Sequence, residues 1–311
     1  MEIGLGLPHL GHFADPDATR AAAIAAEDAG FASLWAMDRL LSPVAPRSFG
    51  YPGRADGILP HVQERVLDPL VTLTLAAAVT DRVRLGTDVL VAPWYPPALL
   101  ARSLAAIDQV SRGRLTVGLG LGWSVDEFDA VGARMAGRGS RLEEVLDVLA
   151  ALWAPGPTSI STAHETITRS VMGLKPVQRP GPPILLATFS PPGLDRIARR
   201  ADGWLPFGLG LDETATTWDS LRTAASRHGR NPDDLQLVVR ADPTFTDVRL
   251  GSDRPSFTGT PDQVAGDIDR ARQIGATGVI LDLQTTTCEV DQLIATALDL
   301  TTDRPAALAA A

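Results

Sequence analysis

The stretch Gly113-Arg114-Leu115-Thr116-Val117-Gly118-Leu119-Gly120-Leu121-Gly122-Trp123 decides the fold that we predict for this chain. Glycine occupies every second position from Gly118 to Gly122, and a period of two is that of a β-strand, so one face carries no side chains. Glycine weakens a strand and therefore marks a place where another group approaches the backbone closely. That group is either a flat ligand or a tightly packed neighbour. We favour the ligand at the end of the strand, where an indole and a helix start follow.

Around this strand the sequence repeats one unit, an amphipathic helix followed by a glycine and a short apolar strand. Helical patterns over 22–29, 99–110, 194–201 and 264–274 each end near a glycine, a common helix stop. The unit predicts eight strands, near residues 2–7, 32–38, 83–91, 114–120, 183–188, 203–207, 235–242 and 278–283. Eight alternating strands and helices are typical of a TIM barrel, so we predict a (β/α)8 barrel of the α/β class.

Helix starts are marked as clearly as helix ends. Asp15 precedes Pro16, which places a capping side chain before a proline at the first helical position. The run Thr260-Pro261-Asp262-Gln263 fits a capping box.

Two insertions interrupt the predicted barrel, one after its second strand and one after its fourth helix. Residues 40–66 are rich in proline, glycine and arginine and follow a strand, so they are expected at the mouth where barrel active sites form. Residues 154–182 contain a possible hairpin and are long enough to fold over the same mouth. We expect residues 1–303 to form a single catalytic domain and the alanine-rich residues 304–311 a frayed tail.

Composition excludes several classes of function. The chain has 311 residues and a net charge of -9 without a basic stripe, which argues against a nucleic-acid partner. Its start lacks a signal-peptide pattern and no run is apolar for long enough to span a bilayer, so a cytoplasmic protein without a membrane partner is expected. The single cysteine, Cys288, is expected to be structural. No metal-ligand spacing is present, so no metal is expected.

Polar residues at the ends of the predicted strands are the candidates for chemistry. Asp38 and Asp88 follow neighbouring strands and could accept hydrogen bonds from a polar ring or orient an arginine. The alternative is an internal ion pair, for instance with Arg39 or Arg84.

Two histidines follow the first predicted strand. His9 and His12 are candidate general acids, and the alternative is that each is a hydrogen-bonded surface residue.

Several motifs then follow one another in order along nearly the whole chain. They are Asp81-Arg82-Val83-Arg84-Leu85-Gly86-Thr87-Asp88-Val89-Leu90-Val91-Ala92-Pro93, Ser111-Arg112-Gly113-Arg114-Leu115 through Gly122-Trp123 with Glu127-Phe128, Arg138-Gly139-Ser140-Arg141-Leu142-Glu143-Glu144, Pro182-Pro183-Ile184-Leu185-Leu186, Ala201-Asp202-Gly203-Trp204 and Gly259-Thr260-Pro261. Together they resemble the bacterial luciferase-like flavin and deazaflavin oxidoreductases. The resemblance implies a TIM barrel that holds a flavin-like ring at its mouth.

The resemblance also implies where that ring is held. A non-prolyl cis peptide is expected at Asp88–Val89, in a bulge that backs the ring, and a phosphate-binding turn is expected over 187–190. The residues implied as cofactor-binding are Asp38, Thr87, Asp88, Val89, Leu121, Gly122, Trp123, Asp126, Ala187, Thr188, Phe189 and Ser190. The turn departs from the glycine-rich family pattern, since Pro191 and Pro192 remove two backbone donors.

The function implied is hydride transfer between the deazaflavin coenzyme F420 and a small organic substrate. Trp94, Tyr95 and Phe207 are expected as apolar walls for the substrate, and His9, His12 or Arg39 as the group that donates a proton or polarises the acceptor. Sugar-phosphate dehydrogenases of the family carry His where this chain has Arg39 and Glu where it has Trp123, so that activity is not expected.

Two other functions remain open for the same motifs. One is an FMN-dependent monooxygenase that activates oxygen, and the other is a barrel that binds a flavin-like ligand without turnover. A homodimer is expected, formed through the predicted helices over 67–80 and 98–110.

Overall fold

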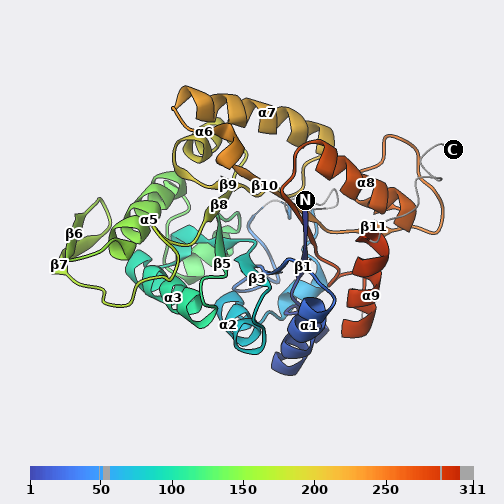
Figure 1. The fold of residues 1–311 in the computed structure, drawn as a ribbon, viewed down its shortest axis with the longest axis horizontal. Helices are drawn as coiled ribbons and strands as arrows, with labels where there is room; N and C mark the ends of the chain where they lie inside the picture. The colour runs from blue at the N-terminus through green and yellow to red at the C-terminus, as the bar shows by residue number, and fades with distance from the viewer. Residues whose placement is uncertain (49, 52–56, 288, 302–311) are drawn as a thin grey trace.

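Parallel strands close into a barrel surrounded by helices in the computed structural model, which describes residues 1–48, 50–51, 57–287 and 289–301 (Figure 1). The barrel strands are β1 (Glu2–Gly6), β2 (Ser33–Ala36), β3 (Arg84–Thr87), β4 (Leu90–Val91), β5 (Leu115–Gly120), β8 (Ile184–Ala187), β9 (Gly203–Trp204), β10 (Gln236–Ala241) and β13 (Gly278–Leu281). Segments β3 and β4 are two parts of one barrel strand and both pair with β5, while β1 pairs with β2 and β13. The barrel is therefore closed with 8 strands, which confirms the predicted TIM barrel.

Helices cover the outside of the barrel between successive strands. They are α1 (Pro16–Asp28), α2 (Pro69–Val79), α3 (Pro97–Val110), α5 (Arg138–Trp153), α6 (Pro191–Arg200), α7 (Leu211–Arg227), α8 (Pro261–Gln273) and α9 (Val290–Thr301). The two predicted helix starts are confirmed, because the Asp15 side chain accepts hydrogen bonds at the start of α1 and Thr260 with Gln263 forms a capping box on α8. The apolar faces of these helices and the strands form the main core.

The glycine face of β5 makes room for the break between β3 and β4. A Cβ atom on Gly118 would lie 2.0 Å from the carbonyl oxygen of Thr87, and one on Gly120 would lie 2.6 Å from the Val89 side chain. The Thr87 hydroxyl donates to the Gly118 carbonyl and accepts from the Gly118 amide, both at 2.8 Å. These glycines therefore serve close packing of a neighbouring strand, the alternative that the sequence had left open.

The indole of Trp35 fills the interior of the barrel, and a glycine on the neighbouring strand again makes the room for it. Trp35 on β2 lies opposite Gly86 on β3, and a Cβ on Gly86 would meet the indole at 2.2 Å. The indole nitrogen donates to the Ser33 hydroxyl at 2.8 Å, so its one polar group is satisfied inside the barrel. The other buried residues of this inner cluster are Leu185, Leu205, Val238 and Ile280.

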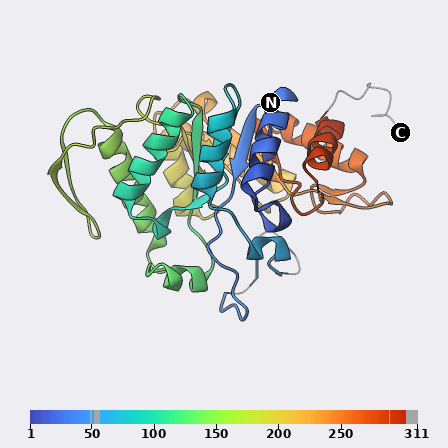
Figure 2. The same cartoon turned by 90° about the horizontal axis from the view of Figure 1, so that it is seen from below.

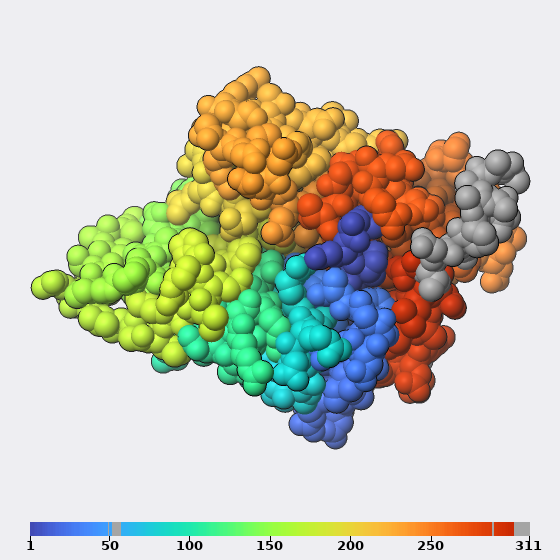
Figure 3. All heavy atoms as spheres, viewed as in Figure 1, coloured from blue at the N-terminus to red at the C-terminus, as the bar shows by residue number. Residues whose placement is uncertain are grey.

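The two insertions lie in different places. Figure 2 shows the segment that follows β2 and the short helix α4 (Val125–Ala130) together at the end of the barrel opposite the N terminus. The second insertion forms the predicted hairpin, β6 (Thr158–Ser161) and β7 (Thr166–Ser170), which projects at the left of Figure 3. Its Glu165 pairs with Arg141 of α5 at 2.5 Å. The hairpin is therefore held against the outer helix layer, and although residues 154–182 are long enough to reach the barrel mouth, none of them lines the cavity there.

Some sequence-based expectations concern residues that the structure does not describe. Cys288 and the tail 304–311 lie outside the described residues. Within the described part of the chain, no helix is long and apolar enough to cross a membrane. No group of three or more His, Cys, Asp or Glu side chains in that part could hold a metal ion.

We predict that Gly118→Ala destabilises the fold, because its methyl group would overlap the backbone of Thr87. Overpacking of this kind costs roughly 3 kcal/mol of unfolding free energy, since a carbonyl oxygen cannot swing aside as a flexible side chain can. Gly266→Ala is the matched control, because no atom lies within 4 Å of its added Cβ and it sits in helix α8. It should gain about 0.5–1 kcal/mol. Urea denaturation of both variants checks the pair, and equal stabilities would contradict the packing account.

Candidate functional site

A cavity of about 400 Å³ opens at the carboxyl ends of the barrel strands. It is lined by Met37, Asp38, Arg39, Tyr51, Asp88, Val89, Val91, Trp94, Gly120, Leu121, Gly122, Trp123, Glu127, Arg138, Ala187, Thr188, Phe189, Ser190, Leu205, Phe207 and Arg240. These residues come from the ends of most of the strands and from the segment after β2. A concave, mainly apolar site with a few convergent polar groups at this end of a TIM barrel is where a ligand is expected.

The bulge between β3 and β4 forms one wall of the cavity. The peptide bond between Asp88 and Val89 is cis and is not prolyl, as the sequence resemblance implied. The bulge is held from both sides, since the Asp88 amide donates to the Ala36 carbonyl at 3.0 Å and the Asp38 amide to the Val89 carbonyl at 3.3 Å. The wall is therefore a fixed surface of backbone and the Val89 side chain.

A turn at the start of helix α6 forms one end of the cavity. Ser190 is the N-cap residue, and its hydroxyl accepts from the Gly193 amide at 3.3 Å. This hydrogen bond engages one of the few backbone donors that Pro191 and Pro192 leave in the turn. Arg138, the first residue of α5, lines the same cavity and brings a positive charge that sequence reasoning did not include. An arginine beside a helix N-terminus is a suitable partner for a phosphate.

Asp38 is held by two hydrogen bonds at the end of β2. Its Oδ2 accepts from the Tyr95 hydroxyl at 2.8 Å and from the Val91 amide at 3.1 Å. Burial raises the pKa of Asp38 to about 6, although both hydrogen bonds act to lower it. The carboxyl therefore changes its charge close to neutral pH.

The alternative of an internal ion pair is confirmed for Asp88, but its partner is Arg240, at 3.7 Å, rather than either of the two arginines named from the sequence. Arg39 pairs with Glu127 and Arg84 with Glu2, so neither arginine contacts Asp38 or Asp88.

Arg39 and Glu127 form a buried ion pair that ties the segment after β2 to helix α4. Arg39 Nη1 lies 2.6 Å from Glu127 Oε2, and the two side chains are 4% and 1% exposed. Glu127 Oε1 also accepts from the Leu40 amide at 2.9 Å, and the Arg39 Nε and Nη2 groups donate to Gln63 Oε1. Charge and hydrogen bonds are thus satisfied together, which a buried pair needs in order to be stable.

Aromatic rings form the wall of the cavity beside Arg39. The ring centroids of Tyr51 and Trp123 are 5.7 Å apart with their planes near perpendicular, and Phe207 lies 6.4 Å from Tyr51. The Arg39 guanidinium carbon lies 5.2 Å from the Trp123 ring centroid, a cation–π distance. This wall of the cavity therefore offers a substrate apolar surfaces together with the fixed guanidinium of Arg39.

Arg240 of β10 lies beneath the bulge with three carboxylates around it. It donates to Asp282 at 2.8 Å and to Asp242 at 2.9 Å, and its Nε lies 3.7 Å from Asp88 Oδ2. Burial raises the pKa of Asp88 to about 7, while the charge of Arg240 acts to lower it. Phe207 covers the guanidinium, whose carbon lies 4.9 Å from the ring centroid.

Three buried side-chain atoms lack a hydrogen-bond partner among the described residues, and all three belong to residues that line this cavity. They are Asp88 Oδ2, Trp94 Nε1 and Arg138 Nε. A buried polar atom without a partner costs about 1–3 kcal/mol, so such atoms rarely gather in one place by chance. Their convergence indicates a site built for a polar ligand.

The structure brings most of the predicted site residues to the cavity and leaves five away from its lining. His9 is buried with both ring nitrogens at hydrogen-bond distance from the backbone of Leu7 and Met37, and burial lowers its pKa. His12 is exposed and lies against Phe13, with the two ring planes tilted by 41°. The other three are Thr87, bonded to Gly118, Tyr95, bonded to Asp38, and Asp126, bonded to Arg47.

Sequence reasoning missed four functional candidates, for different reasons. Glu127 and Arg138 stand inside the motifs that carried the resemblance, and Arg240 stands at the end of a barrel strand, so the strand-end rule could have found it. Tyr51 lies in the long insertion, where no periodicity marks it.

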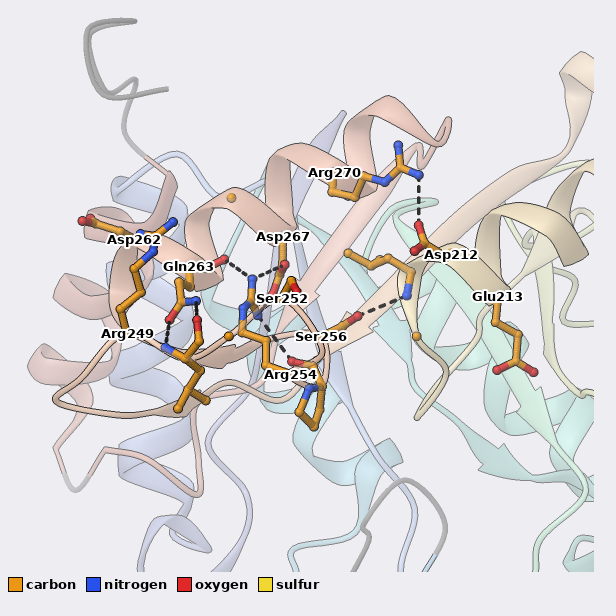
Figure 4. Close-up of a pocket in the computed structure, with 16 residues that line it drawn as sticks. Asp212, Glu213, Arg249, Ser252, Arg254, Ser256, Asp262, Gln263, Asp267 and Arg270 are labelled. Atoms are coloured by element: carbon orange, nitrogen blue, oxygen red, sulfur yellow. Dashed lines mark hydrogen bonds and ion pairs between the residues drawn. The ribbon is translucent and has the colours of Figure 1, made fainter. Parts of the chain in front are cut away.

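A second hollow, of about 660 Å³, lies between the start of α7 and the segment before α8 (Figure 4). Its charged side chains mostly pair with one another. Arg254 donates to both carboxylate oxygens of Asp267 at 2.7 and 2.8 Å, and Arg270 to Asp212 at 3.0 Å. This hollow shares no residue with the cavity at the barrel mouth, which we take as the functional site.

Comparison with known proteins identifies the family of this chain. Residues 4–249 match the family described as luciferase-like monooxygenase. An uncharacterized protein of Mycobacterium tuberculosis is 34% identical over 252 residues, which cover 79% of this chain and 88% of the relative. A phthiodiolone/phenolphthiodiolone dimycocerosates ketoreductase of Mycobacterium kansasii is 30% identical over 251 residues, 79% of this chain and 66% of the relative.

Solved structures share the fold at lower identity. The monooxygenase RslO1 from Streptomyces bottropensis has a TM-score of 0.77 at 22% identity and covers 96% of each chain. The coenzyme F420 dependent tetrahydromethanopterin reductase from Methanopyrus kandleri has a TM-score of 0.74 at 17% identity, over 96% of this chain and 97% of that one.

We predict that Glu127→Gln destabilises the protein by about 3–5 kcal/mol, because it leaves the buried guanidinium of Arg39 without its counter-charge. Arg39→Gln should cost a comparable amount of stability, because it leaves the buried carboxylate of Glu127 without its counter-charge. The double variant should lose less stability than the sum of the two single losses. Asp126→Asn is the control, since its arginine partner is exposed and the melting temperature should hardly move. Thermal unfolding measures all four variants, and additive losses would show that the pair is not coupled.

Proposed function

The chain belongs to the luciferase-like monooxygenase family, and from this premise we propose that it is an oxidoreductase that uses the deazaflavin coenzyme F420 on a small organic substrate. The observation that carries the proposal is the gathering of Asp88, Trp94 and Arg138, each with an unpartnered buried atom, around one cavity at the barrel mouth. A flavin-like cofactor has both the flat ring and the phosphate that such a set of partners suits.

Each part of the cavity has a partner in such a cofactor. The bulge at Asp88 and Val89 would back the ring, and Leu121 to Trp123 would line its edge. Arg138 and the hydroxyls of Thr188 and Ser190 would hold the phosphate, with the start of helix α6 behind them. The bound cofactor supplies hydride chemistry, while the protein supplies position and charge.

Arg39 is the residue that we assign to the substrate. An arginine keeps its proton at neutral pH, so Arg39 would polarise an oxygen atom of the substrate and stabilise negative charge there. It would not deliver a proton. Trp94, Tyr51 and Phe207 would form the apolar walls, and the segment clamped by Glu127 would exclude water.

Two observations bear on the choice of cofactor. Among the structural neighbours, an F420-dependent secondary alcohol dehydrogenase in complex with an F420-acetone adduct has a TM-score of 0.77. The monooxygenase RslO1 has the same score, and an FMN-dependent monooxygenase is therefore our second candidate function. A barrel that binds the cofactor without turnover is the third.

We also propose a homodimer formed through α2 and α3. Helix α2 contains no charged side chain, which is unusual for a helix at a surface, and Val71 is 50% exposed on it. Leu99 on the neighbouring helix α3 is 51% exposed. A second copy of the chain would cover these apolar side chains.

We predict that the protein binds F420 more tightly than FMN when the two are titrated side by side and followed by absorbance and fluorescence. Arg138→Ala should weaken binding of a phosphate-bearing cofactor roughly ten- to hundredfold, the worth of a charge-assisted hydrogen bond. Binding of the same ring without its phosphate should be unchanged. Arg134→Ala, a nearby exposed arginine outside the lining, is the control.

Three outcomes would contradict parts of this prediction. Tighter binding of FMN, with oxygen consumed and an oxygenated product formed, would favour the monooxygenase. Binding without turnover on any substrate would favour the non-catalytic barrel. Binding of neither cofactor would remove the proposed function.

The dimer is tested by Val71→Glu and Leu99→Glu, which should convert the protein to monomers because a charge cannot be buried unpaired at the interface. Val248→Glu, at a side chain 68% exposed elsewhere, should leave the dimer intact. Light scattering during gel filtration measures the mass of each variant. A wild-type protein that runs as a monomer would refute the dimer.

A further inference from the structure

Asp88 stands out as the buried acid with the poorest set of partners. It is 6% exposed, lines the cavity, and belongs to the bulge that would back the cofactor ring. Its Oδ2 has no hydrogen-bond partner among the described residues. A buried carboxylate oxygen without a hydrogen bond disfavours the charged form relative to the neutral acid.

Arg240 does not donate the missing hydrogen bond to Asp88 Oδ2. Its Nε carries a single hydrogen, and that hydrogen is donated to Asp242 at 2.9 Å. Its Nη2 donates to Asp282 at 2.8 Å, and its Nη1 lies 3.3 Å from the backbone oxygen of Asp88. The nearest approach of Arg240 to Asp88 Oδ2 is therefore an ion-pair distance of 3.7 Å without a hydrogen bond.

The other two carboxylates around Arg240 are better satisfied than Asp88. Asp282 also accepts from the Gln284 side chain at 3.1 Å, and the Asp242 side chain is 33% exposed to solvent. His9, on the neighbouring strand end, is bonded to backbone atoms and its pKa is lowered by burial. Asp88 is therefore the carboxyl beside Arg240 with an oxygen that lacks a hydrogen-bond partner among the described residues.

We propose that Asp88 is a positioning residue that takes up a proton when the reduced cofactor binds and releases it when that cofactor leaves. This inference rests on the proposed function. The reduced ring of a flavin or deazaflavin carries negative charge near neutral pH, and an anion beside Asp88 favours its neutral form. The proton passes between solvent and the Asp88 carboxylate, and no electron or other bond is involved.

Neutral Asp88 differs from the carboxylate in a second way. The acid carries an O–H that can donate a hydrogen bond into the cavity, whereas the carboxylate can only accept. Burial raises the pKa of Asp88 to about 7, and nearby Asp282 and Asp242 act in the same direction. The change of state therefore falls within the pH range in which the protein can be studied.

The test is the affinity of the full-length, cofactor-free protein for reduced cofactor as a function of pH. Wild type, Asp88→Asn and Asp242→Asn are titrated anaerobically with reduced F420 and with reduced FMN, from about pH 5.5 to about pH 8.5. Wild-type affinity should fall up to about tenfold per pH unit above the Asp88 pKa, in excess of the slope for Asp88→Asn. The comparison removes the cofactor's own titration, because that is common to both proteins.

Asp242→Asn is the matched control for this experiment. It makes the same carboxyl-to-amide change beside Arg240, at a residue outside the cavity lining. It should keep the excess slope but move its midpoint to lower pH, because loss of a nearby negative charge lowers the pKa of Asp88.

Thermal unfolding of the cofactor-free protein gives an independent measurement. The Asp88 pKa is raised on folding, so the wild type should lose stability relative to Asp88→Asn as pH rises from about 4 to about 7. Asp88→Ser replaces the asparagine variant if that protein does not fold.

The outcomes separate the two proposals. Parallel affinity curves for wild type and Asp88→Asn would overturn the role of Asp88 and leave the proposed function standing. Failure of wild type to bind either cofactor would overturn the proposed function and this inference with it.

Discussion

The contact between β5 and the break in the neighbouring strand is the constraint on which the cavity depends. Gly118 and Gly120 leave no side chain between β5 and the segment at Thr87 to Val89, so this segment can bulge inward. Any larger residue would push β5 away from β3 and β4, with which it pairs on either side of the bulge. A rigid wall at the barrel mouth is therefore made by removing side chains from the adjacent strand.

Ion pairs that hold the segment after β2 are a second constraint, and they fix the wall of the cavity formed by that segment. Between β2 and the short turn at His61–Glu64, none of the residues that the structure describes belongs to a helix or a strand, so this part of the chain needs side-chain contacts to hold its shape. The Arg39–Glu127 pair supplies them at depth, and Arg47 with Asp126 and Asp129 supplies them at the surface. An exposed ion pair contributes little to stability, whereas breaking a buried one is strongly destabilising. The Arg39–Glu127 pair therefore fixes this wall, and the Arg47 pairs contribute little to its stability.

The sequence could predict those features of the protein that depend on residues close together in the chain. Period-two glycines and glycine-terminated helices are local signals, and they predicted the barrel and each of its strands. Asp38 and Asp88 could be found because every strand end reaches the same mouth. The partners of Arg39 and Asp88 could not, since Glu127 and Arg240 are distant in sequence. The hairpin was predicted, but its position was not. That position depends on the pair between Arg141 and Glu165, and no sequence pattern links these two residues.

The charged side chains described here lie on two walls of the cavity, and each wall combines an arginine with carboxyl groups. Arg39 is paired with Glu127 and lies beside the rings of Trp123 and Tyr51, so its guanidinium is held in place by an ion pair and by aromatic faces. Asp38 and Asp88 lie at the ends of β2 and β3, where burial raises their pKa values to about 6 and about 7. A ligand between these walls would meet the Arg39–Glu127 ion pair on one side and, on the other, two titratable acids, one of them 3.7 Å from Arg240. Such an arrangement suits a reaction in which charge develops on the substrate while the charge of the cofactor changes, because each change then has its own compensating group.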